Sequence, residues 1–125
     1  MKVIEVNGHT ELINKLNELS KEEYLKDQPI FICFVGSKLA TTGKSWCSDC
    51  VNAEPAIDET LLELKELDNI FVICYVGDKD EWTNPANTLK NDVKFGVKCV
   101  PTLIAYSDED FIDSGNIVSF IVSLT

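Results

Sequence analysis

The stretch Trp46-Cys47-Ser48-Asp49-Cys50 holds two cysteines separated by two residues, directly after an aromatic residue and before a run with helical spacing. Two thiols at this spacing lie close enough to cycle between a dithiol and a disulfide. If a helix begins at the first cysteine, free backbone N–H groups and the positive end of the helix dipole favour a thiolate there. We therefore predict that Cys47 is a nucleophile and that Cys50, one turn further along and more shielded, is the resolving thiol.

The segment that begins with the first cysteine, residues 47–67, is predicted to form one long helix. Pro55 lies inside this run, where it removes one backbone hydrogen bond and is expected to kink the helix. Apolar side chains recur on one face and acidic side chains fall mostly off it. The apolar positions are Ala53, Ile57, Leu61 and Leu64, and the acidic ones are Glu54, Asp58, Glu63 and Glu66.

Two continuous apolar runs, residues 30–35 and 70–76, lie on either side of this helix in the sequence. Runs of this kind are typical of strands that are buried on both faces at the centre of a sheet. Residues 2–6 are predicted to form a short strand, and residues 10–25 an amphipathic helix. The apolar face of that helix consists of Leu12, Ile13, Leu16 and Leu19.

The second half of the chain predicts a further helix, two strands and a final helix. Asn84 is expected to cap a helix over residues 85–92 that begins with Pro85, with residues 80–85 forming the preceding loop. Pro101 lies at the mouth of a strand-like run over residues 95–106, a position that often marks a cis turn. Residues 107–110 predict a turn, 111–113 a short strand and 114–124 an apolar helix.

Composition excludes several classes of protein. A chain of 125 residues is predicted to fold as a single domain over residues 1–125, and we expect a monomer. Its net charge of −10 argues against nucleic acid and an anionic membrane surface as partners. No apolar run approaches the roughly 20 residues of a membrane span, and the start of the sequence lacks the pattern of a signal peptide, so we expect a cytoplasmic location.

The motif Gly43-Lys44-Ser45 follows a predicted strand and invites comparison with a phosphate-binding loop. Such a loop needs a glycine five residues before this motif, and that position is Lys38. The spacing therefore argues against nucleotide binding.

The order of these elements and their motifs resembles a thioredoxin over most of the chain. Residues 95–103, Phe-Gly-Val-Lys-Cys-Val-Pro-Thr-Leu, are similar to the thioredoxin segment that carries a cis-proline. Closer still is the resemblance to the 14 kDa thioredoxin-related proteins, the thioredoxin domain-containing protein 17 family. The matching residues are Gly36-Ser37-Lys38, Gly43-Lys44-Ser45, Trp46-Cys47, Asp49-Cys50-Val51, Ala53-Glu54-Pro55, Trp82, Pro85 and Asn87.

The resemblance implies an α/β thioredoxin fold, with a central mixed five-stranded sheet flanked by about four helices. It implies that Cys47 attacks a substrate disulfide and that Cys50 resolves the mixed disulfide. Pro101 is then in the cis form against the cysteine pair, while the backbone of Val100 holds the substrate as an added strand. Trp46 shields the site.

The resemblance also implies an activity and its partners. The family consists of cytosolic disulfide reductases that take electrons from NADPH through thioredoxin reductase and reduce cystine and selected protein thiol modifications. We accordingly expect no bound cofactor and no metal, and disulfide-containing small molecules or proteins as substrates.

The sequence departs from the family pattern at two places. Ser48 occupies a position that is usually proline, and we expect a less reducing dithiol because a hydroxyl there can stabilise the thiolate of the reduced form. Thioredoxins also bury an aspartate and a lysine beneath the motif, where this chain has Cys33 and Cys74. Asp49, or water, is left as the candidate base for the resolving thiol, although an acidic residue in the first turn also stabilises a helix through its dipole alone.

Two alternative functions and a third candidate thiol stay open at this point. The chain could be a redox-inactive binding module that uses the groove at Pro101, or a zinc site built from Cys47, Cys50 and further cysteines, although it lacks a second CxxC or a histidine pair. Cys99, two residues before Pro101, is a candidate third redox-active thiol. Cys33 and Cys74 lie in apolar runs and are expected to be inert core residues.

Overall fold

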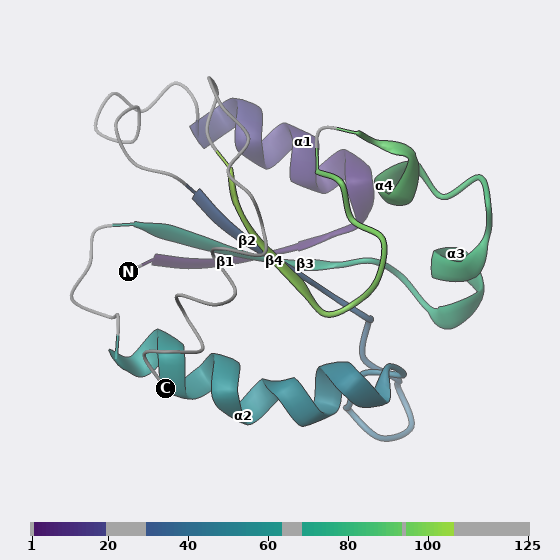
Figure 1. The fold of residues 1–125 in the computed structure, drawn as a ribbon, viewed down its shortest axis with the longest axis horizontal. Coiled ribbons are helices and arrows are strands. Elements are labelled where there is room, and N and C mark those ends of the chain that lie inside the picture. The colour runs from purple at the N-terminus through teal and green to yellow at the C-terminus, as the bar shows by residue number, and fades with distance from the viewer. Residues whose placement is uncertain (1, 20–29, 64–68, 94, 107–125) are drawn as a thin grey trace.

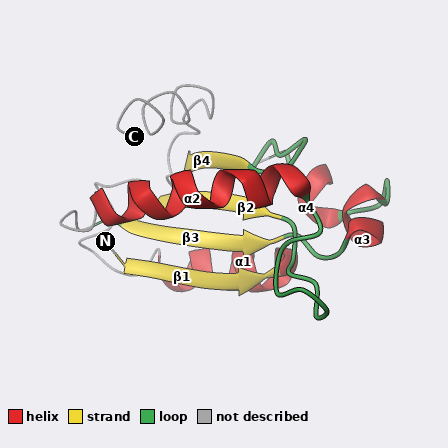
Figure 2. Ribbon diagram, turned by 90° about the horizontal axis from the view of Figure 1, so that it is seen from below, coloured by secondary structure: helices red, strands yellow, loops and turns green. Residues whose placement is uncertain are grey.

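The computed structural model describes residues 2–19, 30–63, 69–93 and 95–106. Within these ranges, four strands form one mixed sheet in the order β1-β3-β2-β4. The strands are β1 Lys2–Asn7, β2 Ile30–Val35, β3 Ile70–Tyr75 and β4 Thr102–Tyr106. The first three run parallel to one another, and β4 pairs antiparallel with β2. Helix α2, Ser48–Glu63, covers one face of the sheet, and α1, Gly8–Leu19, covers the other (Figures 1 and 2).

The two central strands are the apolar runs that the sequence singled out. Cys33 of β2 stands opposite Ile73 of β3, and side chains of both strands enter the core. Ile32, Phe34 and Val72 have no exposed surface. Neither strand alternates apolar and polar residues because helices cover both faces of the sheet.

Helix α1 packs its apolar face against β1 and β3, with Leu12, Leu16 and Leu19 buried as predicted. Gly8 begins this helix directly after β1 and has a φ of +80°, a conformation that other residues rarely adopt. Helix α2 contains Pro55, as predicted, and buries Cys50 and Thr60. Among the described residues, no helix has both the length and the apolar character needed to cross a membrane.

The prediction for residues 80–92 was wrong in its boundaries. Two short helices occupy this region, α3 Lys79–Thr83 and α4 Thr88–Asn91. Asp78 caps α3 in a reciprocal capping box with Glu81, and Asn87 caps α4. Asn84, the predicted N-cap, instead follows α3 as its C-cap. Asp78 accepts from the Glu81 N–H and Asn87 accepts from the Lys90 N–H, so each short helix has its own N-cap.

Residues 95–101 form a loop rather than the start of the predicted strand, and β4 begins only at Thr102. The peptide bond between Val100 and Pro101 is cis, as the sequence predicted. The predicted sheet of five strands therefore has four in the described part of the chain. The predicted strand at residues 111–113 and the final helix at 114–124 lie outside the described residues.

Candidate active site

The cysteine pair lies at the carboxyl-terminal edge of the parallel strands, where α2 begins (Figure 2). Cys47 is 8% exposed and Cys50 is 3% exposed. The backbone N–H of Cys50 donates to Sγ of Cys47 across 3.2 Å, and the Cys47 thiol donates to the carbonyl oxygen of Val100 across 3.6 Å. Cys47 thus faces both the first turn of the helix and the segment that carries the cis proline.

Cys50 is held in a different environment from Cys47. The backbone N–H of Gly36 lies 3.5 Å from Sγ of Cys50, at the end of β2. Burial, followed by the interaction with Cys47, raises the pKa of Cys50 to about 12, while hydrogen bonds from Gly36 and Ser45 act in the opposite direction. The Cys50 thiol is therefore protonated at neutral pH and needs a proton acceptor before it can attack a disulfide.

Ser45 links the two cysteines, a role that the sequence reasoning missed. Its Oγ accepts a hydrogen bond from the backbone N–H of Cys47 at 3.1 Å, and its hydroxyl also interacts with the Cys50 sulfur. A Cβ atom on Gly36 would approach both Ser45 Oγ and the Trp46 ring to 2.8 Å. This close packing needs a glycine at position 36. A glycine directly after a predicted strand was the signal in the sequence that could have indicated a close approach of other residues at this point.

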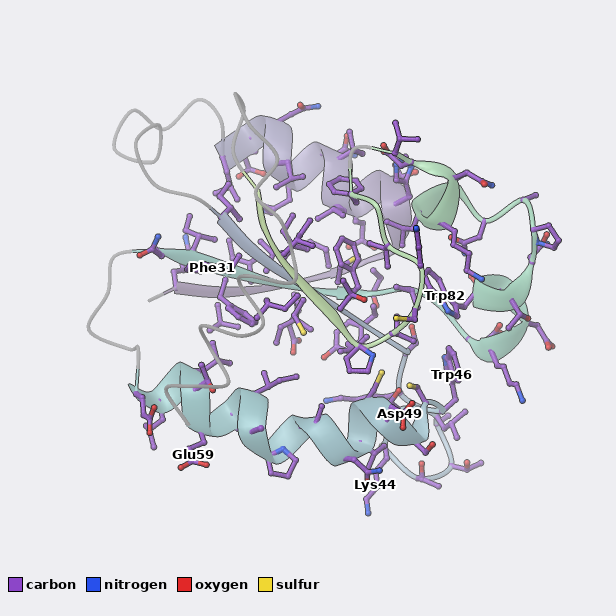
Figure 3. All side chains as sticks on the ribbon, viewed as in Figure 1. Phe31, Lys44, Trp46, Asp49, Glu59 and Trp82 are labelled. Carbon is purple, nitrogen blue, oxygen red and sulfur yellow. The ribbon has the colours of Figure 1, made fainter. Side chains whose placement is uncertain are left out.

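Trp46 is half-buried beside the pair and joins the loop before α2 to the end of β3. Its Nε1–H donates to the Gly77 carbonyl at 2.8 Å, and the Gly77 N–H donates in turn to Oγ of Ser37 at 2.9 Å. Trp82 lies at the same end of the molecule (Figure 3), where it is buried in the core with the ammonium of Lys90 4.5 Å from its ring centroid. Trp82 is thus a packing residue rather than part of an exposed rim.

The structure brings Val100 and Pro101 together with the cysteine pair, whereas Ser48 and Asp49 lie on the surface of the molecule. Val100 is buried with its carbonyl on Cys47, and Pro101 is partly buried directly after it. Ser48 and Asp49 are both exposed on the first turn of α2. The predicted roles of these two residues, on the Cys47 thiolate and as a base, stay predictions.

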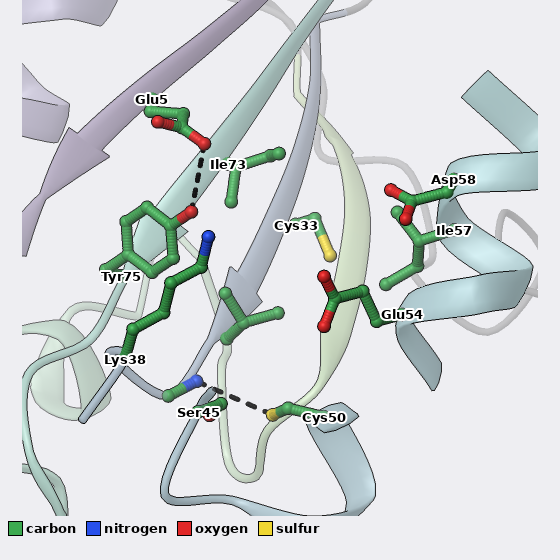
Figure 4. Close-up of a pocket in the computed structure, with 12 residues that line it drawn as sticks. Glu5, Cys33, Lys38, Ser45, Cys50, Glu54, Ile57, Asp58, Ile73 and Tyr75 are labelled. Atoms are coloured by element: carbon green, nitrogen blue, oxygen red, sulfur yellow. Dashed lines mark hydrogen bonds between the residues drawn. The ribbon is translucent and has the colours of Figure 1, made fainter. Parts of the chain in front are cut away.

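A pocket of about 160 Å³ opens behind Cys50, between α2 and the sheet (Figure 4). Cys33 and Cys50 lie on its wall with Tyr75, whose hydroxyl donates to Glu5 at 3.0 Å. Burial, and then the contact with Glu5, raises the pKa of Tyr75 to about 12. The charged residues on its wall are Glu5, Lys38, Glu54 and Asp58.

The three remaining cysteines differ in burial. Cys33 and Cys74 are buried in β2 and β3, where burial raises the pKa of each thiol to about 12, and Cys99 is exposed. All five cysteines belong to the described residues and are free thiols. Among the residues described here, no three histidine, cysteine or acidic side chains are grouped as metal binding requires. The zinc alternative therefore has no supporting cluster in this part of the chain.

Comparison with known proteins decides the family. The model of the family described as thioredoxin domain-containing protein 17-like, thioredoxin domain, matches residues 5–120. The chain belongs to this family. Thioredoxin domain-containing protein 17 of Mus musculus is 49% identical over 77 residues, which are 62% of this chain and 59% of the mouse protein. The thioredoxin-like protein Clot of Arabidopsis thaliana is 37% identical over 109 residues, 87% of this chain and 80% of the plant protein.

Solved structures show the same fold. Thioredoxin of Fasciola hepatica aligns with a TM-score of 0.55 at 18% identity, and the reduced thioredoxin pre-protein of Schistosoma mansoni with a TM-score of 0.54 at 19% identity. Each comparison covers 100% of both chains. The fold is that of a thioredoxin, as the sequence predicted. Membership of the thioredoxin domain-containing protein 17-like family, together with the adjacent thiols of Cys47 and Cys50, supports a thioredoxin-type oxidoreductase.

Proposed function

We propose that this protein is a cytoplasmic reductase of cystine-like small-molecule disulfides and of selected protein disulfides. Cys47 is the nucleophile and Cys50 the resolving thiol, and no cofactor is bound. The electrons come from NADPH through thioredoxin reductase or a reductase of that type. The observation that carries the proposal is the position of the Cys47 sulfur, between the Cys50 N–H at 3.2 Å and the Val100 carbonyl at 3.6 Å.

The first step is attack by Cys47 on a substrate disulfide. The N–H of Cys50, in the first turn of α2, directs positive partial charge at the Cys47 sulfur. The thiolate forms a bond to one substrate sulfur, and the other substrate sulfur leaves as a thiolate. We expect the polar backbone at Val100 to hold an extended substrate next to Pro101.

The second step releases the remaining half of the substrate. Cys50 loses its proton and attacks the sulfur of Cys47, so that a disulfide forms within the protein and the second substrate thiolate departs. The reductase partner then transfers two electrons to this disulfide and restores both thiols. Trp46, fixed to Gly77 by its hydrogen bond, covers one side of the pair throughout this cycle.

The proposal is tested by following NADPH oxidation in a mixture of thioredoxin reductase and cystine. We expect oxidation that requires the protein and that stops in Cys47→Ser, whereas Cys99→Ser keeps the activity because its thiol is exposed outside the pair. Equal NADPH oxidation with and without Cys47 would contradict the proposal. Replacing cystine by insulin measures how far the activity extends to protein disulfides.

A further inference from the structure

The proposed reaction needs an acceptor for the proton of the resolving thiol, Cys50. The pocket behind Cys50 is the place to look for this acceptor. The resemblance to thioredoxins implies an aspartate beneath the motif as the acceptor, but this chain has Cys33 near that position. Burial raises the pKa of Cys33 to about 12, so its thiol is neutral and is no proton acceptor at physiological pH. The backbone N–H of Gly36 donates to the Cys50 sulfur and takes no proton from it.

Among the described residues, the groups that face this pocket leave few candidates for the acceptor (Figure 4). Lys38 is a cation with no acceptor site, and the pKa of Tyr75 is raised to about 12, so that its hydroxyl stays protonated. Glu5 already accepts the hydroxyl hydrogen of Tyr75 at 3.0 Å. Glu54 and Asp58, both on α2, are the two remaining carboxylates on the wall.

Helix geometry distinguishes these two carboxylates. Glu54 follows Cys50 by four residues, so it lies on the same helix face at about 6 Å along the axis, whereas Asp58 is about 12 Å away. In Figure 4 the Glu54 side chain reaches from α2 into the pocket, between Cys33 and Cys50. Asp49, in contrast, is exposed at the start of α2 and does not line the pocket.

The pocket also suits a proton transfer through water. Its volume of about 160 Å³ holds several water molecules, and its wall offers polar partners in Glu54, Ser45 and Lys38. Glu54 is an exposed residue, so its carboxyl group can exchange a proton with bulk solvent after each cycle. The buried thiol of Cys50 and the exposed carboxylate of Glu54 both border the pocket, so water within it can connect this thiol with solvent.

We propose that Glu54 accepts the proton of Cys50 through a water molecule in this pocket during resolution of the mixed disulfide. The Cys50 thiol gives its proton to the water, which passes one to the Glu54 carboxylate. The Cys50 thiolate then attacks Sγ of Cys47, and the electron pair of the broken bond leaves on the substrate sulfur. The inference rests on the proposed reductase function and names Glu54, in place of Asp49, as the base for the resolving thiol.

A chromogenic aromatic disulfide, dithiobis-nitrobenzoate, separates the two steps in a stopped-flow experiment. Attack by Cys47 releases the first coloured thiolate and resolution by Cys50 the second. All variants carry Cys99→Ser, which removes the exposed thiol. At pH 7 we expect Glu54→Gln to leave the first phase unchanged and to slow the second by about 10- to 100-fold. Glu54→Asp keeps a carboxylate, so its second-phase rate should lie between those of the wild type and Glu54→Gln.

The pH profile and two matched variants test the assignment further. In Glu54→Gln the second phase should rise with pH until it approaches the wild-type rate, because hydroxide replaces the missing acceptor. Asp58→Asn and Glu59→Gln each remove one negative charge from the same helix and should change the second phase less than threefold. A wild-type second phase in Glu54→Gln, or an equal loss in either control variant, would overturn the inference. Absence of the first phase in the wild type would refute the reductase function itself.

Discussion

The indole N–H of Trp46 donates a 2.8 Å hydrogen bond to the backbone carbonyl of Gly77. This bond joins the loop before α2 to the end of β3, across 31 positions of sequence. The same carbonyl accepts a hydrogen bond from the backbone N–H of Ser37 at 3.0 Å. The backbone N–H of Trp46 in turn donates to the Ser37 carbonyl at 3.3 Å. The aromatic residue of the motif is therefore part of a small network that holds the loop in place beside Cys47.

Trp46→Phe keeps a six-membered aromatic ring and removes the five-membered ring of the indole together with its N–H donor. The Gly77 carbonyl retains the N–H of Ser37, so no buried acceptor is left unpaired. We expect the free energy of unfolding to fall by about 1 kcal/mol in urea denaturation. Ser37→Ala removes the partner of the Gly77 N–H and should cost at least as much. No loss of stability in either variant would show that the network does not hold the loop.

Gly36→Ala is expected to damage the site because its Cβ would lie 2.8 Å from both Ser45 Oγ and the Trp46 ring. Relieving this overlap should cost about 1–3 kcal/mol of stability and displace the partner of the Cys47 N–H, lowering the rate of disulfide reduction. Gly43→Ala is the matched control. Gly43→Ala strains the backbone, because Gly43 has a φ of +71°, but its Cβ would meet no atom within 4 Å. Gly43→Ala should therefore lose stability and keep its rate, and equal rates in both variants would contradict this account.

The buried thiols of Cys33 and Cys74 predict a loss of stability at alkaline pH. Burial, with a further contribution from Cys74 at Cys33, raises the pKa of each from 9.0 to about 12. Below pH 9 both thiols are protonated in the folded and unfolded chains, so they cause no pH dependence. Between pH 9 and 12 the unfolded chain loses protons that the folded chain keeps, and stability falls as the pH rises.

Urea denaturation at several pH values under reducing conditions measures this effect. Each thiol contributes a slope of up to about 1.4 kcal/mol per pH unit above pH 9. Cys33→Ala and Cys74→Ala should each make the slope shallower. An unchanged slope in both variants would show that these thiols do not cause the alkaline loss.

Ser48 predicts a less reducing dithiol than a Cys-Pro-Asp-Cys motif. Ser48 is the first residue of α2, a position that proline favours because its φ suits the start of a helix. Ser48→Pro should therefore fold normally and have a lower reduction potential in a titration with reduced and oxidised glutathione. A lower potential in the wild type than in Ser48→Pro would refute this prediction.

Local patterns predicted the elements that depend on neighbouring residues. The strands at 30–35 and 70–75 follow from their apolar runs, and the cis bond at Pro101 was expected from its place before a strand. Helix α3 was missed, although Asp78 and Glu81 carry the spacing of a capping box. The more conspicuous Asn84-Pro85 pair was taken as the helix start instead.

Contacts between distant parts of the chain were not predictable in the same way. The Nε2 atom of His9 lies 2.9 Å from Oδ2 of Asp92, 83 positions away, and no pattern near His9 in the sequence indicates this contact. Glu54 was assigned to the polar side of its helix, and only the fold shows that this side borders a pocket shared with Cys50. The spacing of one segment cannot show which residues another segment brings opposite it.

The most direct test of the account is the mass and location of the adduct that cystine forms with single-cysteine variants of the pair. In a Cys99→Ser background, Cys50→Ser, which retains the proposed nucleophile and lacks the resolving thiol, should accumulate one cysteinyl group, and peptide mapping should place it on Cys47. Cys47→Ser should form no adduct on Cys50, because that thiol is buried and its pKa is raised to about 12. An adduct on Cys50 in Cys47→Ser, or none on Cys47 in Cys50→Ser, would contradict the assignment of nucleophile and resolving thiol.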